Sequence, residues 1–233
     1  MRILITGANR GLGLALTTKA CARGHQVFAG VRSAESSAER ILALSTQFPE
    51  QIKILSLDVT NENSVRYASE QVSSQMSSLD VIINSAAILL GREQKLAQLD
   101  FVQVQQSFQT NLFGPMIILK YFLPLLKKGK HQAVVNISSE AGSVAGAYGG
   151  DYSYALSKAA LNMFSAQLRQ ELKPEGVLVH AVHPGWIRTD MGGDHAPGNA
   201  TESANGILDI IERKIEAENE ALFIDHKGKA ISI

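Results

Sequence analysis

The chain has 233 residues, of which 22 are basic and 22 acidic, so its formal net charge at pH 7 is zero. This length suffices for one large domain with a substantial core, and the balanced charge favours no nucleic-acid or membrane-surface partner. The single cysteine, Cys21, excludes an intrachain disulfide and a multi-cysteine metal site, and no bound metal is expected.

Short apolar segments rich in β-branched residues alternate along the chain with helical patterns. The predicted strands are residues 2–6, 26–31, 53–57, 81–84, 133–138, 178–183 and 221–224. The predicted helices are residues 11–23, 36–47, 61–76 (capped by Thr60 or Asn61), two between 95 and 126, then 152–172 and 201–218. This alternation predicts an α/β fold: a single doubly wound Rossmann domain over residues 1–233, with a parallel sheet of about seven strands and helices on both faces.

The turn after the first predicted strand is rich in glycine, and in such folds ligands bind at the carboxyl ends of the strands. It reads Thr6-Gly7-Ala8-Asn9-Arg10-Gly11-Leu12-Gly13. Without side chains at its three glycines, the backbone can turn tightly and a pyrophosphate can approach the N-terminus of the next helix. The alternative is a glycine-rich turn that holds no ligand.

The second predicted strand ends in Val31 and Arg32, close to where NAD-binding folds place an acidic residue that holds the ribose hydroxyls. An arginine there can pair with a 2′-phosphate instead, and Arg10 in the turn can add a second positive charge. These residues favour NADP(H) over NAD(H). The alternative is that Arg32 is an ordinary solvated surface residue.

Tyr154 and Lys158 are four residues apart in a predicted helix, so they share one of its faces. A fixed ammonium favours the phenolate and lowers the pKa of the phenol from its usual value of about 10. The pair therefore predicts a proton donor and acceptor near neutral pH, although the same spacing also arises by chance.

Four motifs occur in one order along nearly the whole chain: the glycine-rich turn, Ser138-Ser139, Tyr154 with Lys158, and Pro184-Gly185. Together they resemble the short-chain dehydrogenase/reductase family. Residues 149–154, 157–163 and 184–193 most resemble its branch of C-factor and sniffer-like carbonyl reductases. The chain departs from the family at residues 84–87, where Asn-Ser-Ala-Ala stands in place of the usual Asn-Asn-Ala-Gly.

The resemblance implies four catalytic positions. Tyr154 is the general acid/base, and Lys158 holds the nicotinamide ribose and lowers the tyrosine pKa. Ser139 hydrogen-bonds the substrate oxygen, and Asn111 holds a water that relays protons to Lys158. From the residues alone, Ser139 can equally cap a strand end, and Asn111 can satisfy the backbone at a helix kink near Pro115.

The resemblance also implies cofactor contacts beyond the turn. Asp58 and Val59 meet the adenine, Asn84 and Ala86 border the adenosine ribose, and Ile187 and Thr189 meet the nicotinamide half. Asp58 can also be a simple turn residue before a helix. The full expected NADP(H) contact set is Gly7, Asn9, Arg10, Gly11, Leu12, Gly13, Arg32, Asp58, Val59, Asn84, Ala86, Tyr154, Lys158, Pro184, Gly185, Ile187 and Thr189.

The expected activity is NADPH-dependent reduction of a carbonyl group. The alternative is an NADP(H)-binding signalling protein of C-factor type with little or no turnover. A sugar epimerase or dehydratase is disfavoured, because those relatives have a larger C-terminal region. Apolar and aromatic side chains in residues 140–148 and 185–197 favour an apolar or aromatic small-molecule carbonyl substrate, and residues 185–200 are a candidate lid without clear structure.

Two further expectations concern the whole molecule. The helical segments 116–126 and 152–172 carry more apolar surface than the sheet can cover, so we expect a homodimer through these two helices. The alternative is a monomer in which both are wide core helices. The apolar run 116–126 is too short to span a bilayer and no targeting peptide precedes the first strand, so no membrane partner and a cytoplasmic location are expected.

Overall fold

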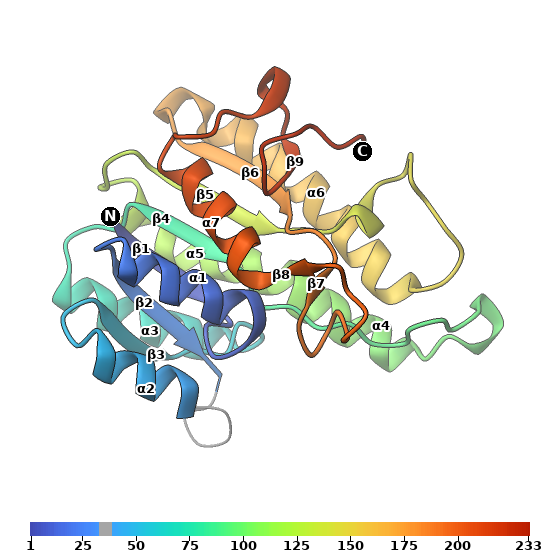
Figure 1. The fold of residues 1–233 in the computed structure, drawn as a ribbon, viewed down its shortest axis with the longest axis horizontal. Helices are drawn as coiled ribbons and strands as arrows, with labels where there is room; N and C mark the ends of the chain where they lie inside the picture. Colours follow the sequence, from blue (N-terminus) through green and yellow to red (C-terminus); the bar gives the residue numbers. More distant parts are fainter. Residues whose placement is uncertain (33–38) are drawn as a thin grey trace.

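Seven parallel strands form one sheet in the order β3-β2-β1-β4-β5-β6-β9 (Figure 1). The computed structural model describes residues 1–32 and 39–233. The strands are β1 (Arg2–Thr6), β2 (Gln26–Val31), β3 (Ile52–Ser56), β4 (Val81–Asn84), β5 (Ala133–Ile137), β6 (Leu178–His183) and β9 (Phe223–Asp225). This is the predicted doubly wound Rossmann fold. The strand order reverses between β1 and β4, which is where such sheets bind ligands.

Helices cover both faces of the sheet, because alternate strand residues point to opposite sides and both sides are apolar. Ile3 and Ile5 enter one core, and Leu4 between them enters the other. The first core lies under α1 (Gly11–Ala22), α2 (Glu39–Gln47) and α7 (Ala200–Ile211), and the second under α3 (Glu62–Gln75), α5 (Gly114–Leu126) and α6 (Tyr152–Leu172). No helix within residues 1–32 and 39–233 is both long and apolar enough to cross a membrane.

Most predicted elements agree with the structure to within two residues, and Asn61 caps α3 by accepting a hydrogen bond from the Ser64 N–H. The predicted helix 36–47 is described from Glu39 onward, and its first three residues lie outside the described ones. The predicted lid does contain structure: within it, β7 (Ile187–Arg188) pairs with β8 (Gly198–Asn199), and Ile187 is buried.

Helix α7 ends seven residues before the predicted boundary at residue 218. Arg213 has a φ of 58°, which reverses the chain. The N–H groups of Lys214 and Arg213 bond to the carbonyls of Asp209 and Ile210, and this pairing closes the helix in a Schellman motif. The apolar Ile215 after this turn packs against the core.

The two helices predicted between residues 95 and 126 are α4 (Phe101–Phe108) and α5, and a π-helical segment, Gln109–Phe113, joins them. Pro115 has no N–H to donate to the Asn111 carbonyl four residues earlier, so regular α-helical bonding is interrupted there. Asn111 is only 1% exposed in this widened turn. The proline thus helps to bring a polar side chain into the interior.

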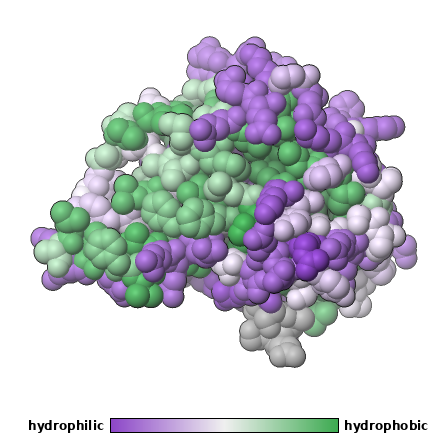
Figure 2. Space-filling view, turned by 180° about the vertical axis from the view of Figure 1, so that it is seen from behind, coloured by the Kyte–Doolittle hydropathy of each residue, from purple (hydrophilic) through white to green (hydrophobic). Residues whose placement is uncertain are grey.

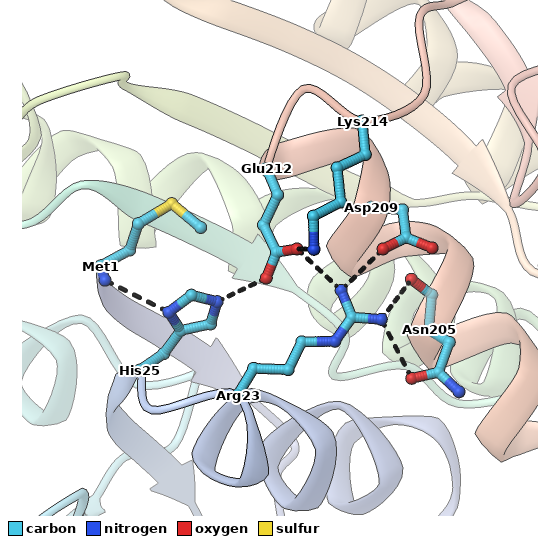
Figure 3. A network of polar contacts seen from close by, with 7 residues as sticks. All are labelled: Met1, Arg23, His25, Asn205, Asp209, Glu212 and Lys214. Carbon is cyan, nitrogen blue, oxygen red and sulfur yellow. Dashed lines mark hydrogen bonds and ion pairs between the residues drawn. The ribbon is translucent and has the colours of Figure 1, made fainter.

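A polar network fastens α1 and α7 together near the amino ends of the strands (Figure 3). The Glu212 carboxylate accepts hydrogen bonds from His25 Nε2 at 2.7 Å and from Arg23 at 2.9 Å. Arg23 also donates to Asp209 at 2.8 Å, and the Met1 amino group lies 3.2 Å from His25 Nδ1. The Glu212 side chain is 10% exposed, so its loss would leave several donors without an acceptor.

We therefore expect Glu212→Gln to lower the free energy of unfolding by about 1–3 kcal/mol, because an amide oxygen accepts more weakly than the carboxylate. Urea unfolding at neutral pH measures the difference. Glu171→Gln, on the exposed side of α6, is the matched control and should change stability by less than about 0.5 kcal/mol. Equal losses in the two variants would contradict a special role for the network.

Candidate active site

A pocket of about 320 Å³ opens at the carboxyl ends of β5 and β6. Ser138 and Ser139 follow β5, Tyr154 lies in the first turn of α6, and all three line the pocket. The loop after β6 forms another wall with Pro184 and Trp186. The fold therefore brings the separate motifs of the sequence to one place.

Lys158 lies behind Tyr154, one turn further along α6. Lys158 is 2% exposed, and its Nζ donates a 2.7 Å hydrogen bond to the carbonyl of Ile137, the last residue of β5. The ammonium nitrogen is 5.6 Å from the centre of the Tyr154 ring. Strand β5 thus fixes the lysine, and the helix fixes the phenol relative to it.

The predicted lowering of the Tyr154 pKa is not found. Burial raises the pKa of Tyr154 to about 12, although a hydrogen bond with Ser139 acts in the opposite direction. Burial also lowers the pKa of Lys158 to about 7, because the interior solvates an ammonium poorly. A fully charged lysine would lower the tyrosine pKa, but the burial that brings Lys158 to the site weakens its charge near neutral pH.

Ser139 begins a short 3₁₀ turn, Glu140–Gly142, and caps it. Its Oγ accepts a 3.2 Å hydrogen bond from the Ala141 N–H, and the same hydroxyl lies close enough to the Tyr154 phenol to affect its pKa. A hydroxyl that accepts one hydrogen bond still has a proton to donate. Ser139 can therefore act as a cap and face a ligand at once.

Asn111 uses its whole side-chain amide in hydrogen bonds. Its Oδ1 accepts from the Ile88 N–H at 2.9 Å, and its Nδ2 donates to the Ile88 carbonyl at 2.9 Å and to the Ser157 hydroxyl at 3.0 Å. Ser157 in turn donates to the Tyr154 carbonyl at 2.7 Å. Asn111 thus satisfies the backbone of Ile88 in the loop after β4, not that of the helix kink near Pro115, and ties the π-helical segment to α6. A water relay from Asn111 to Lys158 stays a prediction.

The glycine-rich turn is too closely built for side chains at two of its positions. A Cβ atom at Gly13 would lie 2.1 Å from the Gly7 carbonyl oxygen, and one at Gly7 would lie 2.9 Å from the Ala86 Cα. Arg10, the N-cap residue of α1, gives no side-chain cap. A helix N-terminus that its N-cap side chain does not cap favours an anion, and the closely built turn fits the diphosphate of a dinucleotide.

Residues 84–87, which depart from the family pattern, lie directly beside the glycine-rich turn. The Thr6 hydroxyl accepts hydrogen bonds from the N–H groups of Ser85 at 3.0 Å and Ala86 at 3.1 Å. These bonds hold the Ala86 backbone against Gly7. The last residue of β1 thus positions the loop that follows β4.

The residues expected at the adenosine end also have structural partners. Asp58 accepts hydrogen bonds from the N–H and the hydroxyl of Thr60, so it shapes the turn before α3, and Val59 after it is buried. Asn84 donates to Asn136 on β5 at 2.8 Å, while its buried Oδ1 has no hydrogen-bond partner among the described residues. A buried acceptor without a partner is costly, and a ligand hydroxyl or a water would satisfy it.

The loop after β6 approaches the glycine-rich turn from the other side. A Cβ at Gly11 would be in ordinary contact, 3.4 Å, with the Thr189 side chain. Arg10 is exposed and lies 3.5 Å from the Asp190 carboxylate, which partly neutralises its charge. Arg32 is exposed after the end of β2. Within residues 1–32 and 39–233, an ion pair is found for Arg10 but not for Arg32.

Residues that line the pocket but were not expected there from the sequence include Leu89, Arg92 and His183. Arg92 donates a 3.0 Å hydrogen bond to the Met191 carbonyl and so joins the loop after β4 to the loop after β6. Only His183 had a signal in the sequence, because it is a titratable residue between an apolar strand and Pro184. Leu89 and Arg92 come from a loop whose path the sequence does not indicate.

Comparisons with known proteins agree with this geometry. A family model described as short chain dehydrogenase matches residues 1–200. C-signal of Myxococcus xanthus is 36% identical over 154 residues, covering 66% of this chain and 92% of that protein. NADPH-bound carbonyl reductase from chicken fatty liver superimposes with a TM-score of 0.88 at 31% identity, covering 100% of this chain and 98% of that one. Carbonyl reductase Sniffer of D. melanogaster gives a TM-score of 0.91 at 30% identity, covering 100% and 99%. The predicted resemblance, including its branch, is confirmed.

The burial of Lys158 predicts a pH-dependent stability. Between pH 7 and about pH 10 the unfolded chain keeps the lysine protonated while the folded protein does not, so stability rises with pH in this window. Relative to Lys158→Met, wild type should gain roughly 1 kcal/mol in free energy of unfolding per pH unit. Urea unfolding at several pH values measures the difference in free energy of unfolding between wild type and Lys158→Met. Lys173→Met, at an exposed position, is the control. A difference between wild type and Lys158→Met that does not change with pH would contradict the lowered pKa of Lys158.

Proposed function

The chain belongs to the short-chain dehydrogenase family, and on that premise we propose that it reduces the carbonyl group of an aldehyde, ketone or quinone to an alcohol with NADPH. The observation that carries this proposal is the meeting of Ser139, Tyr154 and Lys158 at one pocket, beside a turn that fits a dinucleotide. The two carbonyl reductases among the similar structures support the reaction class. Residues 1–233 supply both cofactor binding and catalysis as one domain.

Bound NADPH supplies the hydride for the carbonyl carbon. Negative charge then develops on the carbonyl oxygen, where the Ser139 and Tyr154 hydroxyls donate hydrogen bonds. Tyr154 gives this oxygen its proton and so completes the alcohol. A pKa of about 12 keeps the phenol protonated at neutral pH, as a donor in the reductive direction must be. Lys158, when protonated, stabilises the phenolate that remains.

We assign the cofactor to the residues expected from the sequence. The turn from Gly7 to Gly13 holds the diphosphate at the N-terminus of α1. The orphaned Oδ1 of Asn84 accepts from the adenosine ribose, and Ile187 and Thr189 border the nicotinamide half. Arg32 pairs with the 2′-phosphate, which makes NADP(H) the preferred cofactor.

The substrate is an apolar or aromatic compound, because two aromatic rings line the pocket mouth. Tyr148 and Trp186 are each 53% exposed. Their polar tips are already bound: the Tyr148 hydroxyl donates to Asp151 at 3.1 Å, and the Trp186 Nε1 donates to the Gly192 carbonyl at 2.8 Å. The rings are thus held in place while their apolar faces are free for a ligand.

We also propose a homodimer through α5 and α6, in a cytoplasmic protein. Figure 2 shows apolar side chains gathered over much of the face on the far side of Figure 1. The π-helical segment, α5 and α6 carry exposed apolar side chains: Phe113 (43%), Met116 (42%), Leu156 (53%) and Met163 (63%). A contiguous apolar surface of this kind favours association, and a two-fold axis would bury it as one self-complementary patch.

Tyr154→Phe should lower kcat by at least about 100-fold, because the ring still packs but the proton donor is gone. The dissociation constant for NADPH should change by less than about threefold. The measurements are NADPH oxidation with aldehydes, ketones and quinones, and a cofactor titration. Tyr152→Phe, two residues earlier on α6, is the control. Near-normal turnover of Tyr154→Phe would refute the assignment and favour the non-catalytic signalling alternative.

Arg32→Ala should weaken NADPH binding by about tenfold and leave NADH binding unchanged, because only NADPH carries the 2′-phosphate. Arg10→Ala should have the smaller effect, since Arg10 already faces Asp190. Fluorescence titrations give the four dissociation constants. Equal affinities of wild type for the two cofactors would rule out the preference. If wild type prefers NADPH but Arg32→Ala leaves the ratio of the two dissociation constants unchanged, the contact with the 2′-phosphate is assigned to Arg10.

Light scattering at micromolar concentration should give the mass of two chains for wild type. Met163→Glu should give one chain, because a charge in the centre of an apolar interface is poorly solvated. Tyr67→Glu, at an equally exposed position on α3 (59%), should stay dimeric. A wild-type mass of one chain would exclude the dimer.

A further inference from the structure

His183 ends β6 and lines the pocket, but the proposed reaction does not use it. The last ladder bond between β5 and β6 joins the Ser138 N–H to the Val182 carbonyl at 2.8 Å. Beyond it, the Glu140 N–H has left the ladder, and its acceptor is Nδ1 of His183 at 3.2 Å. The imidazole of His183 thus accepts the hydrogen bond that a strand carbonyl would accept in a continued ladder. It thereby holds the peptide group that joins Ser139 to Glu140.

This peptide group helps to fix the position of Ser139, because it connects Ser139 to the 3₁₀ turn Glu140–Gly142 that Ser139 caps. Within the turn, the Gly142 N–H donates to the Ser139 carbonyl at 2.9 Å. At the far end, Asn162 on α6 donates to the Gly142 carbonyl at 3.2 Å. His183 therefore holds the end of the turn next to the reactive hydroxyl, and Asn162 holds the other.

The hydrogen bond also determines which ring nitrogen carries the proton. Because Nδ1 of His183 accepts from an N–H, the neutral ring has its own hydrogen on Nε2. Nε2 lies 3.8 Å from the Glu140 carboxylate, a suitable neighbour for an N–H. A second proton on Nδ1 would face the Glu140 N–H, and the hydrogen bond would be lost.

We propose that neutral His183 is a positioning residue that aligns Ser139 with the substrate oxygen, and that its protonation releases the turn and lowers turnover in acid. The effect on turnover rests on the carbonyl reduction proposed above. The hydrogen bond from the Glu140 N–H and the tautomer of His183 do not depend on it.

The charges around His183 act in both directions. Glu140 from the turn and Asp225, its register partner on β9, raise the pKa of His183, whereas His226 after β9 lowers it. His226 itself lies 4.0 Å from Glu202 on α7. Burial has the largest effect and holds the pKa of His183 below its ordinary value of 6.5. Burial thus favours the neutral form of the ring.

Asparagine provides a matched replacement, because its Oδ1 can accept the Glu140 N–H near the position of Nδ1 and does not titrate. Reduction of 4-nitrobenzaldehyde by NADPH is measured between about pH 5 and pH 8 for wild type, His183→Asn and His183→Ala. We expect His183→Ala to lose about tenfold in kcat at pH 8, with the NADPH dissociation constant unchanged within about twofold. His183→Asn should recover most of this loss. Wild-type kcat should fall in acid, and that of His183→Asn should stay flat over the same range.

The proposal would be overturned if His183→Ala had the same kcat as wild type, or if the kcat of His183→Asn fell in acid as that of wild type does. Thermal unfolding accompanies each variant, and if His183→Ala does not fold, the pH profile of His183→Asn decides. NMR of ¹⁵N-histidine-labelled wild type near pH 7.5 is independent of turnover: an Nε2–H tautomer for His183 supports the proposal, and an Nδ1–H tautomer overturns it. If wild type reduces no aldehyde, ketone or quinone, carbonyl reduction fails together with the effect on turnover, while the tautomer still decides the hydrogen bond.

Discussion

The burial of Lys158 against the last carbonyl of β5 sets the geometry of the whole site. A buried ammonium is costly unless it is hydrogen-bonded, and the Ile137 carbonyl meets its Nζ at 2.7 Å. Sliding α6 along the sheet would take the nitrogen away from that oxygen, so the contact favours one register of helix on strand. With this register, Tyr154 falls one helical turn before Lys158, beside the Ser139 hydroxyl that follows β5.

Other polar side chains on the same face of α6 support this register. Asn162 accepts a 2.6 Å hydrogen bond from Ser138, and Ser165 accepts one at 2.8 Å from Asn136, which in turn accepts from Asn84 on β4. A buried row of this kind is stabilising only when its members meet their partners. It therefore restricts how α6 can lie, and it links the end of β4, expected at the cofactor, to the helix that carries Tyr154.

Exclusion of water acts on the two titratable groups of the site in opposite directions. It raises the pKa of Tyr154 to about 12 and lowers that of Lys158 to about 7. The phenol is thus kept as a proton donor and the amine is made readily titratable, which suits a site that gives a proton to a developing oxyanion. At the rim of the pocket, Arg92 bonds to the Met191 carbonyl and so joins the loops after β4 and β6.

Features that depend on neighbours along the chain could be predicted from the sequence. Its apolar runs and helical patterns predicted the alternating strands and helices, with α6 and β6 placed to the residue, and its glycines predicted a turn too tight for side chains. Contacts between residues far apart in the chain could not be predicted, because they depend on how the whole domain packs. His183 meets Glu140 across 43 positions, Arg23 meets Asp209 across 186, and Asn111 binds the Ile88 backbone. The direction of the Tyr154 pKa shift also depends on contacts between distant residues. A four-residue spacing shows that a lysine is near a tyrosine, but burial, which depends on the packing of the whole domain, decides how much charge that lysine carries.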